Sequence, residues 1–287
     1  MMISMTDILL IATIAGVGGT GLGGLIGTLF KNSSNRMISL LLSLTGGVMV
    51  GIVCFELLTE SVEAAKDFAG ETGIFIAVLS VLLGVFIVLG LNALIDRATS
   101  PQVPHTAEPD HPAAHDNVDE LVHVDHYIEH TRSGGTKRDL WIAGVIIACA
   151  IALHNIPEGM SIGSTYAIGS DGSTVSAIML AVLIGLHNIP EGMAVTVPLV
   201  AGGMGRLKAT LLTAASGIPM IIGAAIGIWV GEMGEVGLAC SLGFASGAML
   251  YVVFGEILPQ AILMDRSRIP AILVVVGILI GMCLIFL

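Results

Sequence analysis

The sequence has 287 residues, of which 55% are hydrophobic and 11% charged, and its mean hydropathy is +0.95. Because soluble domains carry about 25% charged residues, a chain this apolar cannot cover a globular surface with polar groups, which excludes a soluble protein. The formal charge of −11 disfavours nucleic acid as a partner and favours cations. The apolar runs are continuous rather than alternating, which excludes a transmembrane β-barrel.

Eight apolar segments are long enough to cross a bilayer, which requires about 20 apolar residues. We therefore predict an all-α integral membrane protein with eight transmembrane helices. The first run lacks the basic flank of a cleaved signal peptide and is expected to be a retained span. The four cysteines fall inside apolar segments without a CxxC spacing, so we expect buried thiols rather than disulfides or a thiolate metal site. The predicted spans cover residues 7–30, 37–60, 73–96, 139–168, 173–200, 206–231, 236–264 and 269–287.

The basic residues fall on one side of the membrane if there are eight spans, and only Lys66 falls on the other. Cytoplasmic loops carry the excess of Lys and Arg. This distribution predicts a multi-pass protein of the plasma (cytoplasmic) membrane, with both termini extracytoplasmic and the loop 97–138 cytoplasmic. The residues on the cytoplasmic side are Lys31, Arg36, Arg97, Arg132, Lys137, Arg138, Arg206, Lys208, Arg266 and Arg268.

Two internal repeats divide the chain. The segments Leu153–Met160 and Leu186–Met193 are identical over eight positions and begin 33 residues apart. A weaker repeat relates the second and seventh spans, where a methionine precedes a glutamate by seven residues in Met49 and Glu56, and in Met249 and Glu256. The outer triplets of spans start on opposite sides of the membrane, which makes them inverted repeats around a central pair, an architecture of transporters. The predicted divisions are residues 1–96, the loop 97–138, the central pair 139–203, and residues 204–287.

Each copy of the central repeat places a histidine and a glutamate, four residues apart, on one helical face near mid-membrane. A carboxylate in hydrocarbon costs at least about 2.5 kcal/mol, and two that face each other also repel. A divalent cation relieves both costs, although a structural pair of His–Glu hydrogen bonds is the alternative. Imidazole, carboxylate and amide groups without thiolate favour Zn²⁺ as the substrate, with Fe²⁺, Mn²⁺, Co²⁺, Ni²⁺ or Cd²⁺ as alternatives, and no organic cofactor is expected. The predicted metal ligands are His154, Asn155, Glu158, His187, Asn188 and Glu191.

Other polar residues are candidates for the transport path or for regulation. Met49 lies mid-membrane and is a candidate thioether ligand, with plain packing as the alternative. Glu56 and Glu256 are candidate stations on the path of the metal, with snorkelling structural acids as the alternative. Three loop histidines at helical spacing indicate either a weak metal-binding segment or a solvated linker. These loop residues are His123, His126 and His130.

These motifs resemble the ZIP family of divalent metal transporters, particularly its prokaryotic members. The matching segments are His-Asn-Ile-Pro-Glu-Gly in spans four and five, Gly-Val-Met in span two, and Ser-Gly-Ala-Met-Leu-Tyr with Glu-Ile-Leu-Pro in span seven. The resemblance implies eight helices in a 3+2+3 inverted-repeat arrangement, uptake of metal toward the cytoplasm, and a two-metal centre. One implied metal position comprises His154, Glu158, His187, Glu191 and Met49. The other comprises Asn155 and Asn188 together with the same two glutamates as bridging carboxylates.

The sequence therefore predicts a transporter that moves a divalent metal, with zinc as the first candidate, by alternating access through the His/Glu/Asn site. Two alternatives use the same metal chemistry. One is a membrane-embedded metalloenzyme that activates water, and the other is a metal sensor without flux. The predicted partners are divalent metal ions and the lipid bilayer, with the oligomeric state left open and a homodimer as one alternative.

Overall fold

The computed structural model describes residues 4–29, 35–99, 137–168 and 171–286, and every regular element in these ranges is helical. The predicted all-α class is therefore confirmed for this part of the chain. The loop residues His123, His126 and His130 lie outside the described residues, so their role stays a prediction.

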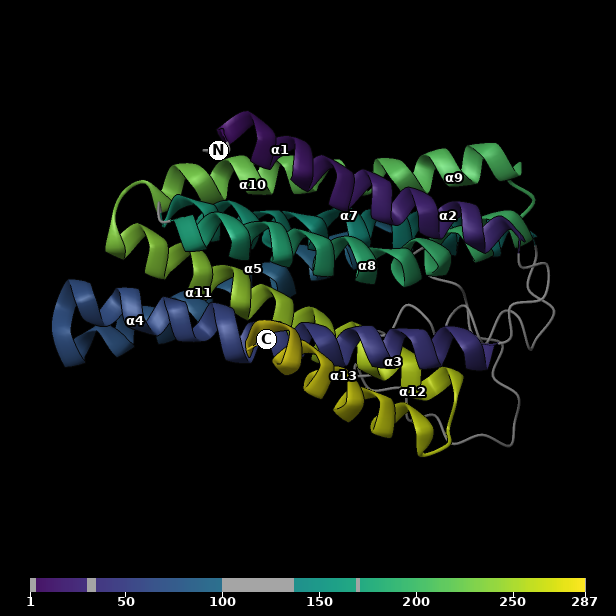
Figure 1. Cartoon of the computed structure of the whole chain (residues 1–287). Helices are drawn as coiled ribbons and strands as arrows, with labels where there is room; N and C mark the ends of the chain where they lie inside the picture. Colours follow the sequence, from purple (N-terminus) through teal and green to yellow (C-terminus); the bar gives the residue numbers. More distant parts are fainter. Residues whose placement is uncertain (1–3, 30–34, 100–136, 169–170, 287) are drawn as a thin grey trace.

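The helices are arranged in two layers (Figure 1). The upper layer contains α1 (Met5–Thr13), α2 (Gly19–Leu29), α7 (Lys137–Ala167), α8 (Asp171–Ala201), α9 (Arg206–Ala215) and α10 (Pro219–Gly231). The lower layer contains α3 (Asn35–Ile52), α4 (Leu58–Ala69), α5 (Ile74–Thr99), α11 (Glu235–Val252), α12 (Leu258–Met264) and α13 (Ile269–Phe286). The layers meet where α11 packs along α7 and where α3 touches α8.

Six helical segments of the described chain are long and apolar enough to cross a membrane, against the eight spans expected. One of them, Ser39–Leu94, has 56 residues and covers most of both predicted spans 37–60 and 73–96. Within it the chain turns at Gly70, whose φ of 61° is a left-handed conformation that favours glycine. Helix α7 is not among the six, although its 31 residues give it a length of about 46 Å.

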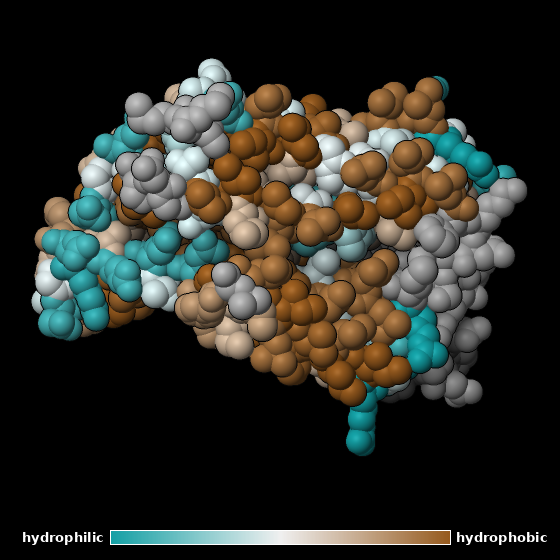
Figure 2. Space-filling view, in the orientation of Figure 1, coloured by the Kyte–Doolittle hydropathy of each residue, from teal (hydrophilic) through white to brown (hydrophobic). Residues whose placement is uncertain are grey.

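Apolar side chains cover the middle of the molecular surface. Figure 2 shows them over the centre of the visible face, with hydrophilic side chains gathered toward its ends. Large apolar residues on both layers are more than half exposed, among them Leu25 on α2, Phe86 on α5 and Val275 on α13. Each such side chain would gain about 1.5–3 kcal/mol from leaving water. The surface therefore suits a multi-pass membrane protein.

Glycines bring the helices of the upper layer to backbone distance. A methyl group at Gly23 on α2 would lie 2.0 Å from the carbonyl oxygen of Ile189 on α8. A methyl group at Gly223 on α10 would likewise lie 2.0 Å from the carbonyl oxygen of Ile156 on α7. The glycines are 200 residues apart and the isoleucines 33 apart. Helix α2 therefore packs on α8 as α10 packs on α7.

The close glycine contacts of the lower layer show the same spacing of 200 residues between corresponding glycines. A methyl group at Gly47 on α3 would lie 2.1 Å from the oxygen of Val274 on α13, and one at Gly247 on α11 would lie 1.9 Å from that of Val81 on α5. Contacts this close leave room only for glycine, because small residues are what allow membrane helices to approach along their backbones.

Two serine hydroxyls donate hydrogen bonds between helices of the lower layer. Ser39 donates to the oxygen of Ala261 over 2.6 Å, and Ser61 donates to that of Ala239 over 2.8 Å. Residues 239 and 261 are the positions 200 beyond 39 and 61. The contact is thus self-complementary, in the manner of the interface of a two-fold symmetric dimer.

Two π-helical turns interrupt corresponding helices. Val53–Leu57 follows α3 and Val253–Ile257 follows α11, and these turns hold Glu56 and Glu256 respectively. A third π-helical turn, Ile14–Gly18, separates α1 from α2. Such bulges expose backbone groups and occur frequently at functional sites.

The prediction that the cysteines are buried is wrong. All four are free thiols as expected, but Cys54, Cys149 and Cys283 are exposed and Cys240 is intermediate. An apolar residue of a membrane helix can satisfy its preference on the outer face as well as in the core, so hydropathy alone did not place these side chains.

Filling one of the close helix contacts should destabilise the protein. We expect Gly223→Ala to cost about 1–3 kcal/mol of unfolding free energy, because the new methyl group meets backbone that cannot move aside. Thermal unfolding in detergent measures the effect. Gly90→Ala on α5 is the matched control, since nothing lies within 4 Å of its added methyl group. Equal melting temperatures for the two variants would contradict the role assigned to the contact.

Candidate metal site

The six predicted ligands of α7 and α8 are all buried in the upper layer. Both helices continue through an internal proline, Pro157 in α7 and Pro190 in α8. None of the six residues is more than 5% exposed. Burial of this many polar groups in a membrane helix pair requires partners for them.

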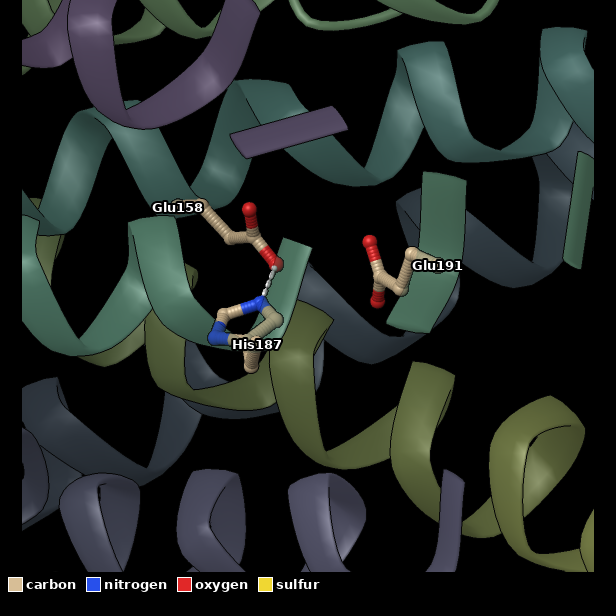
Figure 3. Close-up of side chains that lie close together, drawn as sticks. All are labelled: Glu158, His187 and Glu191. Atoms are coloured by element: carbon tan, nitrogen blue, oxygen red, sulfur yellow. Dashed lines mark hydrogen bonds and ion pairs between the residues drawn. The ribbon is translucent and has the colours of Figure 1, made fainter. Parts of the chain in front are cut away.

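Three of these residues form a compact cluster. The nearest ligand atoms of Glu158, His187 and Glu191 all lie within 4.8 Å of one another. His187 Nε2 lies 2.8 Å from Glu158 Oε1, and Figure 3 shows the Glu191 carboxyl group facing this pair. The second oxygens of Glu158 and Glu191 are buried and have no hydrogen-bond partner. A cation would supply the interaction that these oxygens lack.

The side chain of His154 pairs with Glu256 rather than with the three-residue cluster. Its Nε2 atom lies 3.1 Å from Oε2 of Glu256, which belongs to the π-helical turn after α11. The other oxygen of Glu256 accepts a hydrogen bond from the side-chain amide of Asn92 on α5. The structure thus brings the candidates His154 and Glu256 together, but outside the three-residue cluster.

Asn92 is a functional candidate that the sequence analysis missed. It is 7% exposed and lies in a mainly apolar stretch of α5. A lone carboxamide within a predicted span was the available signal, since polar residues at membrane depth usually have a specific partner.

The two asparagines of the repeats donate hydrogen bonds to backbone carbonyl groups at breaks between helices. Asn155 donates to the oxygen of Ser216, at the break between α9 and α10, over 3.1 Å. Asn188 donates to the oxygen of Ala15, in the π-helical turn before α2, over 3.2 Å. The Oδ1 atom of Asn188 is buried without a partner and is thus the amide oxygen best suited to be a ligand.

The remaining candidates lie on α3 and in the turn that follows it. Met49 is 1% exposed and packs within the main hydrophobic core. Glu56 is half-buried in its π-helical turn. Their assignment to a ligand set or to the path of the metal stays a prediction.

Two carboxylates beside an imidazole make a site for a divalent cation. At 4 Å two like charges repel by about 4 kcal/mol at an effective dielectric constant of 20. A doubly charged ion converts that repulsion into attraction. Imidazole nitrogen together with carboxylate oxygen suits Zn²⁺ and neighbouring divalent transition metals.

Comparison with known proteins decides the family. A model described as "ZIP Zinc transporter" matches residues 3–287. The chain belongs to the ZIP family. This membership confirms the resemblance noted from the motifs and the prediction of a divalent-metal transporter. It also shows that the metalloenzyme alternative is wrong.

Individual relatives cover most of the chain. The sequence is 33% identical over 280 residues to "Zinc transporter ZupT" of Akkermansia muciniphila, covering 96% of this chain and 94% of that protein. It is 31% identical over 264 residues to the protein of the same name from Chlorobium chlorochromatii, covering 90% of each. "Zinc transporter GufA" of Myxococcus xanthus is 35% identical over 132 residues, covering 46% of this chain and 50% of that protein.

Replacing one carboxylate should separate stability from metal binding. We expect Glu191→Gln to raise the melting temperature in metal-free buffer, because a buried oxygen without a donor is replaced by a neutral amide. The same change should abolish most of the stabilisation by zinc, which is about 2.7 kcal/mol at a hundredfold excess over Kd. The exposed Glu232→Gln variant is the control. Undiminished stabilisation of Glu191→Gln by zinc would remove this residue from the site.

Proposed function

We propose that the protein takes up zinc into the cytoplasm by alternating access through the buried residues of α7 and α8. The observation that carries this proposal is the cluster of Glu158, His187 and Glu191, whose ligand atoms converge within 4.8 Å. Relatives that align with nearly the whole chain bear the name zinc transporter. Fe²⁺, Mn²⁺, Co²⁺, Ni²⁺ and Cd²⁺ are competing substrates with the same ligand preferences.

The proposed architecture has eight membrane helices in a 3+2+3 inverted-repeat arrangement. The 200-residue relation between the close contacts of the outer helices supports the two triplets, and the 33-residue relation between α7 and α8 supports the central pair. The distribution of Lys and Arg supports extracytoplasmic termini and a cytoplasmic loop 97–138 in the plasma membrane.

The proposed transport site has two neighbouring metal positions. His154, His187, Glu158 and Glu191 form the first, with Met49 as an additional ligand. Asn155 and Asn188 form the second and share the two glutamates. The unpartnered oxygens of Glu158, Asn188 and Glu191 support an ion between α7 and α8. Glu56 and Glu256, each in a π-helical turn, are proposed stations on either side of this site.

Uptake of ⁶⁵Zn into proteoliposomes tests the function. We expect His187→Ala and Glu191→Ala to lower the initial rate at least tenfold, because each removes a ligand from the cluster. Glu232→Gln should transport like the native protein. The proposal is contradicted if all of these proteins take up zinc equally, or if the native protein takes up none. A native protein that binds zinc without flux would instead favour the sensor alternative, and deletion of residues 105–130 would then abolish its response.

A further inference from the structure

A chain of three polar side chains joins the two layers beside the cluster. Asn92 on α5 and Glu256 after α11 belong to the lower layer, whereas His154 on α7 belongs to the upper layer. One oxygen of Glu256 accepts from the Asn92 amide, and the other lies 3.1 Å from His154 Nε2. The exposed fraction of the Glu256 side chain is 18%, and the two other residues are buried.

The three polar side chains cross the interface between the two layers. Within each layer, glycines hold helices at backbone distance: α2 on α8, α10 on α7, α3 on α13, and α11 on α5. Between the layers, one such backbone contact lies beside the α10–α11 turn, where a methyl group at Gly237 would be 2.1 Å from the oxygen of Val230. Along α7 and α11 side chains meet instead, as where the hydroxyl groups of Ser164 and Ser241 lie 2.5 Å apart. Relative motion of two layers packed in this way separates side-chain pairs and preserves backbone contacts.

We propose that Asn92 and Glu256 form a latch that holds His154 against the lower layer and that must release before His154 Nε2 binds zinc. The inference rests on the proposed zinc transport. An imidazole nitrogen that coordinates a metal donates its lone pair to it and cannot share the same atom with Glu256. Glu256 therefore competes with zinc for this nitrogen. Asn92 is a positioning residue, because it fixes one carboxylate oxygen so that the other faces His154.

Zinc affinity, measured by competition with a chromophoric chelator in nanodiscs, tests the competition. The contact of His154 Nε2 with Glu256 is an ion pair without hydrogen-bond geometry. We therefore expect Glu256→Gln to raise the affinity about twofold to fivefold, the range measured for partly solvated ion pairs. Asn92→Leu should raise it by a smaller factor. Both increases should disappear in a His154→Ala background. The matched control is Ser80→Ala, which removes a buried hydroxyl of α5 that bonds only within its own helix.

Two outcomes of this experiment would overturn the latch. A fall in affinity on Glu256→Gln would make Glu256 a support for metal binding rather than a competitor, as when a carboxylate orients a histidine that coordinates through its other nitrogen. Equal effects with and without His154 would show that the pair does not act through this imidazole.

A second measurement separates the latch from zinc binding. In a background without the four native cysteines, Ser164→Cys and Ser241→Cys place two thiols across the layers, and the rate of their oxidative cross-linking reports how often the layers are closed. Without zinc, Glu256→Gln should slow cross-linking severalfold and Ser80→Ala should not. Unchanged cross-linking in Glu256→Gln would overturn the latch even if zinc transport is confirmed. Slower cross-linking in a protein that fails to transport zinc would keep the latch and reject the transport function.

Discussion

The central physical constraint of this protein is the burial of two carboxyl groups beside each other in a membrane helix pair. Glu158 and Glu191 have exposed fractions of 1% and 4%, and each has an oxygen without a hydrogen-bond partner. Such an arrangement is unfavourable in an apolar medium, and a single histidine, His187, offsets it only for one oxygen. The surrounding helices must therefore be held firmly enough to keep the carboxyl groups together.

The close glycine contacts hold the helices around the two carboxyl groups in place. Where two helices touch along their backbones, many small dispersion contacts act at once and little side-chain entropy is lost. Helix α2 packs on α8 in this way at Gly23, and α10 packs on α7 at Gly223. The asparagines of the repeats extend the same support, because they bond the interrupted backbone next to α2 and α10 at Ala15 and Ser216. The site is thus held by the elements that repeat in the sequence.

The candidate site residues could be named from the sequence, but their pairing could not. A duplicated His-Asn-x-x-Glu pattern in apolar surroundings is visible without a structure, because ionisable residues are rare at membrane depth. The pairing of His154 with Glu256 depends on how α7 packs against α11, a contact between segments about 100 residues apart that no local pattern encodes. Asn92 was overlooked for the same reason, since it has no repeated counterpart that would have drawn attention to it.

The exposed cysteines show a different limit of the sequence. In a soluble protein an apolar residue is expected inside, but a membrane helix offers apolar surroundings on both faces. The interior of this protein is instead marked by its glycines, alanines and serines, such as Gly47 and Ser39, which make the closest contacts. Small residues therefore mark the closest helix contacts, which hydropathy alone does not identify.

The polar residue Asn92 beside the metal site has no polar counterpart in the other half. Gly84 approaches the oxygen of Phe244 as Gly277 approaches that of Leu44, so α5 and α13 correspond with a shift of 193 residues. Asn92 then corresponds to Ile285, which cannot donate a hydrogen bond. In the proposed alternating-access cycle the two halves exchange roles, so a contact confined to one half would stabilise one end state of the cycle relative to the other.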